Sequence, residues 1–164
     1  MIGSMTSGST DATLTPVELA RHFVGAAVDP AGSGLASLYA AVVELEAPFA
    51  PPGVPRRSRV TAEELRAAFG ERDAMRRYTK VDGVSIHETA DDEVVVVEFV
   101  LHGVVRATGH QFELPYICVM TIREGRIVRS RDYTDPVVGA RVIGVVPELI
   151  ADLAASVTGP RSVD

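Results

Sequence analysis

One aspartate near the end of the chain, Asp132, is the strongest candidate for chemistry. It follows the tight-turn signature Glu124-Gly125 and lies in the run Arg131-Asp132-Tyr133-Thr134-Asp135-Pro136. Alternating residues on both sides of the turn predict a β-hairpin, with Asp132 near the end of the second strand. A carboxylate held there, at the rim of an enclosed space, can act as a general base or anchor a ligand. A structural role is the alternative, with the carboxylate hydrogen-bonded inside the fold or capping the turn beyond.

Helices in the first half of the chain and long strands in the second half must position this aspartate. Thr15-Pro16-Val17-Glu18 and Thr61-Ala62-Glu63-Glu64 are capping boxes, which mark helix starts. A short helix over 35–41 and a last helix over 147–156 are also predicted. The predicted strands cover 42–47, 78–89, 94–102, 104–108, 111–123 and 126–134, with a proline-rich loop over 48–60. Helices followed by a meander of strands make an α+β fold.

Length, charge and composition exclude several classes of protein. The 164 residues suit one domain, which we expect over 14–158, with a disordered or appended tail at 1–13 and another tail at 159–164. A net charge of −6 argues against a nucleic-acid partner, because phosphate contacts need a basic surface. No apolar run reaches the ~18 residues of a membrane span, and no secretory signal is evident, so we expect a cytoplasmic protein without a membrane partner.

Metal and cofactor chemistry find no support in the sequence. The four histidines are scattered without the spacing of metal ligands, so we assign no metal site and no cofactor. They are His22, His87, His102 and His110. The single cysteine, Cys118, lies in an apolar run and is expected to be a core side chain.

The order of elements, together with Thr108-Gly109, Glu124-Gly125-Arg126-Ile127 and the run around Asp132, resembles the nuclear-transport-factor-2-like superfamily. Within it, the chain is similar to SnoaL-like proteins, limonene-epoxide hydrolases and ketosteroid isomerases over about Thr15 to Pro136. The resemblance implies an α+β cone, in which a curved, mixed or antiparallel sheet wraps around three N-terminal helices. It also implies a mostly apolar cavity and a homodimer. Such scaffolds host isomerases, hydrolases, cyclases and non-catalytic proteins.

The catalytic residues of these relatives carry over only in part. Asp132 matches the aspartate of the hydrolases' Arg-Asp-Tyr-x-Asp motif, but their Arg-x-Asp pair falls on Phe99 and Leu101. The base and the tyrosine of the isomerases fall on Ala47 and Phe23. SnoaL-type cyclases use an aspartate on a late strand as general base, a role that Asp132 could fill. The chain thus lacks two of the known catalytic sets and keeps one acid.

By this resemblance, the cavity around Asp132 has apolar or aromatic walls, which suit a hydrophobic or polycyclic small molecule with a few polar groups. The expected lining residues are Phe23, Val97, Phe99, Leu101, Leu114, Cys118, Val128 and Ser130. The last two share the face of Asp132 because side chains alternate along a strand.

Three further side chains are candidates for proton transfer with Asp132: Tyr116, Glu44 and Glu46. Carboxylates gathered in an apolar cavity cannot all stay ionised, because burial and like charge raise the pKa, so one acid could donate a proton while another accepts. Alternatively, Tyr116 is a packing residue, and the two glutamates face solvent or pair with Arg56, Arg57 and Arg59.

Three functions remain open at this point. The first is a cofactor-free acid–base isomerase, cyclase or hydrolase that uses Asp132. The second is a non-catalytic protein that binds a hydrophobic small molecule in the same cavity. The third is a dimeric scaffold whose cavity is filled by its own side chains. A long sheet with apolar residues on both faces favours a second copy of the chain as partner in each case.

Overall fold

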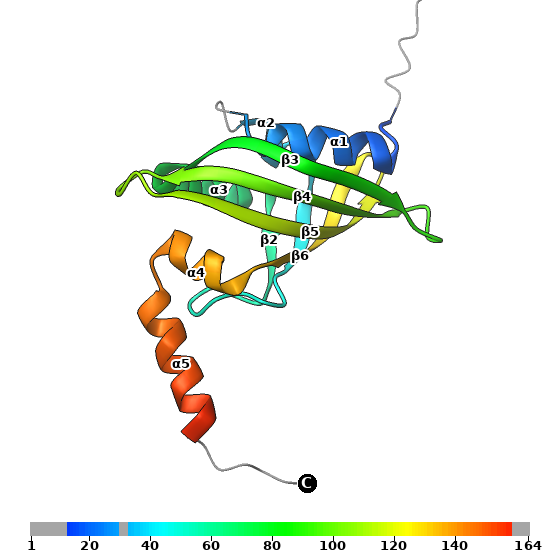
Figure 1. Cartoon of the computed structure of the whole chain (residues 1–164). Coiled ribbons are helices and arrows are strands. Elements are labelled where there is room, and N and C mark those ends of the chain that lie inside the picture. The colour runs from blue at the N-terminus through cyan, green and yellow to red at the C-terminus, as the bar shows by residue number, and fades with distance from the viewer. Residues whose placement is uncertain (1–12, 30–32, 159–164) are drawn as a thin grey trace, which may run out of the picture.

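The computed structural model describes residues 13–29 and 33–158, and Figure 1 shows a curved sheet with helices on its concave side and below it. Residues 1–12 of the predicted tail at 1–13, and the predicted tail at 159–164, lie outside the described residues. The sheet has six strands in the order β2-β1-β6-β5-β4-β3. The strands are β1 Tyr39–Glu46, β2 Arg57–Thr61, β3 Arg76–Glu88, β4 Val94–Val105, β5 Gln111–Arg123 and β6 Arg126–Thr134. The β1–β6 pair is parallel and the other neighbours are antiparallel, which confirms the predicted mixed α+β sheet.

Five helices complete the described part of the chain. They are α1 Pro16–Ala26, α2 Ser33–Ala36, α3 Ala62–Met75, α4 Pro136–Ile143 and α5 Val146–Thr158. Both predicted capping boxes are present: the hydroxyls of Thr15 and Thr61 accept hydrogen bonds from the backbone N–H of Glu18 and Glu64. Each glutamate side chain in turn accepts from the N–H of its threonine, which satisfies donors that a helix start leaves open.

The turn before the strand of Asp132 has the predicted geometry. Glu124 and Gly125 have φ values of 50° and 67°, the left-handed conformation that a tight hairpin requires at both central positions. β5 and β6 pair on either side of this turn over the predicted residues. The register places Cys118 opposite Asp132, so these two side chains lie on one face of the sheet.

Several parts of the chain differ from the prediction. The strand predicted over 104–108 is the end of β4 and stops at Val105. The helix over 35–41 ends early, at Ala36, because Tyr39 begins β1 and packs in the core. The loop over 48–60 contains the edge strand β2, in which exposed arginines alternate with half-buried residues. The chain between β6 and the last helix forms α4, capped by the Asp135 side chain at the N–H groups of Val137 and Val138.

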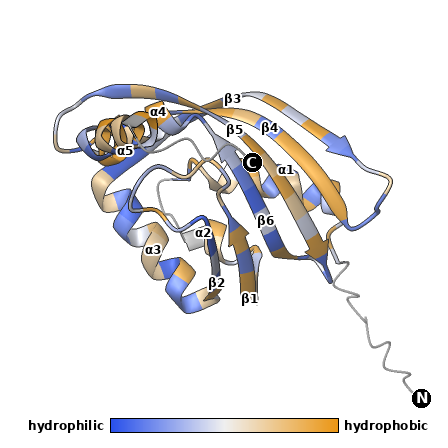
Figure 2. Ribbon diagram, turned by 90° about the horizontal axis from the view of Figure 1, so that it is seen from below, coloured by the Kyte–Doolittle hydropathy of each residue, from blue (hydrophilic) through white to orange (hydrophobic). Residues whose placement is uncertain are grey.

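The core lies between the concave face of the sheet and α1, α2 and α3. Figure 2 shows the apolar residues of the central strands as orange bands on the ribbon. Phe23 of α1 meets Tyr39 and Phe99 edge-on at ring-centre distances of 6.4 and 6.2 Å. Ser130 is the one polar side chain among the fully buried residues of the described chain, and it lies beside Asp132 on β6.

A β-bulge near the start of β6 shifts the alternation of its side chains. Thr121 of β5 pairs with Arg129 and the next residue, Ile122, pairs with Ile127, so Val128 is an extra residue in β6. Ile127 is therefore fully buried, and Val128 turns to the outer face of the sheet. The predicted inward position of Val128 is wrong for this reason.

In the part of the chain that the structure describes, no helix is both long and apolar enough to cross a membrane.

Candidate functional site

Asp132 lies on the concave face of β6 and is held by two neighbouring side chains. The Ser130 hydroxyl donates to Asp132 Oδ1 over 2.5 Å, and the Cys118 thiol donates a second hydrogen bond to the carboxylate. Because Ser130 and Cys118 are fully buried, both donors are fixed in place. The carboxylate itself is half-buried and opens into a pocket.

Burial raises the pKa of Asp132 above its usual range, and the hydrogen bonds from Ser130 and Cys118 oppose this shift only in part. The acid therefore gives up its proton closer to neutral pH than an exposed aspartate does. A carboxyl group with this property can donate or accept a proton under ordinary conditions.

Two tyrosines and the cysteine around Asp132 remain protonated at neutral pH. Burial raises the pKa of Tyr39 well above its usual value, and the nearby charge of Asp132 adds to the effect. Burial also raises the pKa of Tyr116, with smaller contributions from Tyr78 and Asp132, while Arg76 lowers it. For Cys118 the causes are burial and then Asp132, so its thiol is a hydrogen-bond donor and a poor nucleophile.

The pocket beside Asp132 has a volume of about 180 Å³. It lies between β5, β6, the loop after β1 and the first turns beyond β6. Its lining residues are Ala47, Ala50, Pro51, Val54, Arg76, Leu114, Tyr116, Asp132, Thr134, Gly139, Val142 and Ile143. The walls are mostly aliphatic and the polar groups few, as in sites for small organic ligands. Its volume is below the ~300 Å³ at which sites for drug-sized ligands begin, so a polycyclic guest does not fit in this arrangement.

Three of the predicted residues meet at this pocket. Asp132, Tyr116 and Leu114 line it, and the buried side chains of Cys118 and Ser130 support Asp132 from behind. The other predicted lining residues on the concave face lie deeper in the hydrophobic core. These are Phe23, Val97, Phe99 and Leu101. Phe99 stacks parallel on Tyr116 at a ring-centre distance of 5.2 Å, so the core holds the phenol ring in place.

Glu44 and Glu46 do not join Asp132. They pair in register with Arg129 and Arg131 on the outer face of the sheet, whereas Leu45 between them pairs with Ser130. Glu46 accepts a hydrogen bond from Arg129 over 2.8 Å and lies 3.4 Å from Arg57. The hydrogen bond from Arg129 lowers the pKa of Glu46, so it is not a proton donor.

Glu44 lies at a separate hollow on this outer face, together with Arg59 and Val128. The expectation that the two glutamates share a cavity mouth with Asp132 is therefore wrong. The alternation of side chains along β1 fixes Val43 and Leu45 inward and both acids outward.

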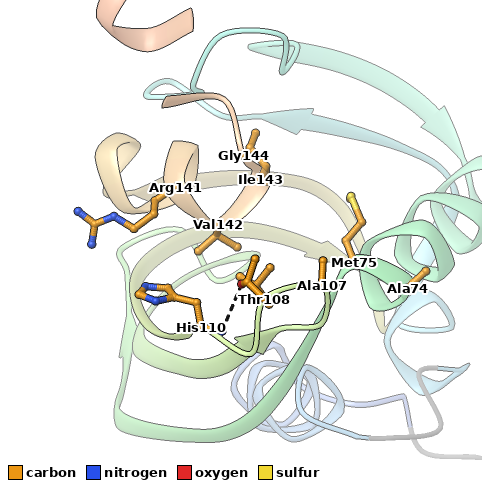
Figure 3. Close-up of a pocket in the computed structure, with 10 residues that line it drawn as sticks. Ala74, Met75, Ala107, Thr108, His110, Arg141, Val142, Ile143 and Gly144 are labelled. Carbon is orange, nitrogen blue, oxygen red and sulfur yellow. Dashed lines mark hydrogen bonds between the residues drawn. The ribbon is translucent and has the colours of Figure 1, made fainter. Parts of the chain in front are cut away.

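A larger hollow of about 720 Å³, whose lining residues are drawn in Figure 3, shares two of them with the Asp132 pocket. It is lined by Ala74, Met75, Val105, Ala107, Thr108, His110, Arg141, Val142, Ile143 and Gly144. Val142 and Ile143 of α4 line both spaces and form part of the wall between them. The ionisable groups of the larger hollow, His110 and Arg141, are exposed, so the buried acid–base groups lie in the smaller pocket.

Arg76 and Thr134, together with α4, are the parts of the site that sequence reasoning missed. The signal for α4 was present, because Asp135-Pro136 combines a preferred N-cap residue with proline at the first helical position, and Gly144 suits the helix end. No comparable signal marked Arg76, which follows directly on the last turn of α3 and begins β3.

Within the described residues, no three histidine, cysteine or acidic side chains come close enough together to hold a metal ion.

Comparisons with known proteins identify the family. Residues 20–130, more than half of the chain, match the model of the SnoaL-like domain. The chain belongs to the SnoaL-like family. The resemblance to SnoaL-like proteins is thereby confirmed.

Similar proteins in this family share both sequence and fold with the chain. The uncharacterized protein YesE of Bacillus subtilis is 36% identical over 105 residues, which cover 60% of this chain and 67% of that protein. A solved structure described as a candidate isomerase, also from Bacillus subtilis, has a TM-score of 0.71 at 27% identity, over 79% of this chain and 92% of that one. A candidate polyketide cyclase from Pseudomonas putida KT2440 has a TM-score of 0.62 at 20% identity, over 74% and 92% of the two chains. The last likeness shows the fold alone.

Proposed function

We propose that this SnoaL-like protein is a cofactor-free acid–base enzyme that moves a proton at a carbon atom next to a carbonyl group of a small, mostly apolar molecule. The observation that carries the proposal is the raised pKa of Asp132 in a pocket with aliphatic walls and a protonated phenol, Tyr116. The candidate isomerase and cyclase among the solved relatives are consistent with this class of reaction.

The proposed step uses two groups of the pocket. Asp132, in its ionised form, takes the proton from the carbon atom, and the electron pair of the broken C–H bond moves to the carbonyl oxygen. The Tyr116 hydroxyl donates a hydrogen bond to that oxygen, where negative charge develops. Return of the proton from Asp132 to a second carbon atom completes an isomerisation. In a cyclisation, the enolate carbon attacks a second carbonyl carbon instead, and the alkoxide that forms takes the proton back from Asp132.

The exchange of carbon-bound hydrogen with solvent tests this proposal directly. In D2O, the protein should catalyse deuterium incorporation next to the carbonyl group of small cyclic ketones, followed by proton NMR. The exchange rate of the Asp132→Asn variant should be lower by a factor of about 100 or more, because general-base catalysis contributes about 10²–10⁴-fold. Unchanged exchange in the folded variant would contradict the role of Asp132.

A non-catalytic binding protein is the second candidate. It is favoured by one observation, namely that Ser130 and Cys118 already satisfy the Asp132 carboxylate with two hydrogen bonds. In that case Asp132→Asn would change the affinity for a ligand, and neither protein would catalyse exchange.

We also propose that the protein works as a homodimer, joined through the outer face of the sheet. Ile117, in the middle of β5, is 44% exposed there, and it pairs in register with Tyr133 of β6. Polar contacts surround this area, among them the His87–Glu98 hydrogen bond at 3.0 Å and the Arg129–Glu46 ion pair at 2.8 Å. An apolar centre with a polar rim is the usual arrangement of a protein–protein interface.

A further inference from the structure

Arg76 lines the Asp132 pocket without a carboxylate partner in the described part of the chain. It begins β3 and shares the concave face with Tyr78 two residues later, whereas Arg77 between them is on the outer face. A half-buried guanidinium is costly to leave unpaired, because burial disfavours its charge. Arg76 is therefore the feature of this pocket that the acid–base proposal leaves unexplained.

The contacts of Arg76 leave most of its donors available. Its Nε donates to the Tyr78 hydroxyl over 3.1 Å, and its guanidinium carbon lies 5.8 Å from the centre of the Tyr78 ring. A guanidinium has five N–H donors, so the terminal nitrogens keep the planar fork that matches a carboxylate. The contact with Tyr78 fixes the direction of this fork.

Nearby acids are engaged elsewhere or lie outside this pocket. Asp73 is bound by Arg72 at 3.0 Å, and Asp29 borders a different, smaller hollow on the other side of Arg76. Arg76 does not appear among the groups that shift the pKa of Asp132, although it lowers the pKa of Tyr116. Arg76, Tyr116 and Asp132 come from β3, β5 and β6, so different strands bring one basic group, one phenol and one acid to the same pocket.

We propose that the ligand of this site is a small monocarboxylate, whose carboxylate binds to Arg76 and whose reacting carbon atom lies at Asp132. Aliphatic residues such as Leu114, Val142 and Pro51 surround the middle of the pocket, so the body of the ligand is apolar. A volume of about 180 Å³ limits that body to about one ring or a short branched chain. This inference rests on the proposed function for the position of the reacting carbon atom, but the carboxylate subsite is testable by binding alone.

Binding of matched acids and amides provides the test. Benzoate and phenylacetate are compared with benzamide and phenylacetamide at pH 7.5, by calorimetry or by ligand-observed NMR. The wild type should bind the better acid at least tenfold more tightly than its amide. Arg76→Met should remove this preference, and Arg76→Lys should retain part of it, because lysine keeps the charge without the fork. Equal affinity of the wild type for acid and amide, or an undiminished preference in Arg76→Met, would overturn the proposal.

Arg77→Met is the matched control, since it removes the same charge one residue further along β3 and should keep the preference. A loss of equal size in this variant would mean that general surface charge, and not the subsite, selects the acid. If Arg76→Met does not fold, the wild-type comparison and Arg76→Lys decide the question.

Asp132→Asn separates this inference from the proposed function. The variant should bind the acid at least as tightly as the wild type does, because a second negative charge is removed from the pocket. If the wild type prefers acids over amides but catalyses no deuterium exchange, the carboxylate subsite stands and the proposed enzyme activity is rejected. If the wild type catalyses exchange but does not prefer acids, the enzyme activity stands and the carboxylate subsite is rejected.

Discussion

At the scale of single residues, the chemistry of this protein depends on an aspartate that the fold keeps in an apolar setting. Ser130 and Cys118 hold the Asp132 carboxylate from the core side, while its other side opens into the pocket. The same burial that raises the pKa of Asp132 also makes its ionised form costly. A functional acid of this kind is expected to reduce the stability of the folded protein at neutral pH.

Asp132→Asn should therefore raise the free energy of unfolding at pH 7. The gain should disappear at acidic pH, where Asp132 of the wild type is protonated. The pKa of Asp132 is raised on folding, so its contribution to stability is fully present below the pKa of an unfolded aspartate. The contribution is lost as pH rises through the higher pKa of the folded state. Each kcal/mol gained should raise the melting temperature by about 2–4 °C for a domain of this size.

Thermal unfolding of wild type and variant between pH 4 and pH 8 provides the measurement. A difference in melting temperature that grows with pH supports the assignment. A difference that is constant over this range would show that Asp132 titrates normally in the folded protein.

Sequence reasoning found Asp132 and Tyr116 together with their neighbours Leu114, Cys118 and Ser130, but it missed Arg76, Thr134 and α4. It found them because strand alternation and a turn signature determine which side chains share a face. It placed Val128 on the wrong face because a bulge leaves no clear trace in composition. It placed Glu44 and Glu46 at the pocket by the resemblance to the hydrolases, whereas the alternation of β1 turns both acids to the outer face.

At the scale of elements, the close packing of β3, β4 and β5 depends on one glycine. Gly103 of β4 allows a close approach, since a Cβ atom there would lie 2.5 Å from the Phe112 ring and 2.8 Å from the Arg77 carbonyl oxygen. Phe112 in turn meets Tyr78 edge-on at 5.9 Å, and Tyr78 orients Arg76. One glycine therefore influences the geometry of the carboxylate subsite.

Gly103→Ala should lower the free energy of unfolding by about 1–3 kcal/mol, the usual cost of overpacking in a core. Denaturant unfolding measures the change. Adding Phe112→Leu to Gly103→Ala should restore only part of the lost stability, because the clash of the new Cβ atom with the Arg77 carbonyl oxygen remains.

Gly70→Ala is the control for this substitution. Gly70 is in the middle of α3 with no atom within 4 Å of its added Cβ, so alanine should stabilise the helix by about 1 kcal/mol. If Gly103→Ala leaves the free energy of unfolding unchanged, the strands can move apart at this position and the predicted overpacking does not occur.

The elements differ in how well the sequence predicted them. β5 and β6 have the predicted bounds, because a long run with period two and a strong turn signal leaves no other arrangement. β2 is a short edge strand with exposed arginines. It was not predicted, because the prolines just before it are typical of a loop. Tyr39 was assigned to a helix because local propensity favours one there, but pairing with β6 prevails in the folded chain.

At the scale of the whole molecule, the outer face of the sheet should bring two copies together. Ile117→Lys places a charge at the centre of the proposed interface, and like charges of two copies would meet there. We expect this variant to elute as a monomer in size-exclusion chromatography with light scattering, whereas the wild type elutes as a dimer. The cost to the fold itself should stay within about 0.5 kcal/mol, as is usual for surface substitutions.

Val84→Lys is the matched control, because Val84 is equally exposed, at 45%, but lies near the distorted part of β3. It should leave the dimer intact. A wild type that elutes as a monomer at micromolar concentration, or an Ile117→Lys variant that remains a dimer, would contradict this interface.

The position of α4 between two pockets has a consequence for the size of the ligand. Two aliphatic side chains, Val142 and Ile143, border spaces of about 180 and 720 Å³. The helix that carries them is tethered by a capped start and by a glycine at its end, with φ of 79°. Shortening those two side chains should widen both spaces and admit bulkier molecules to the same acid, while the reacting groups stay untouched.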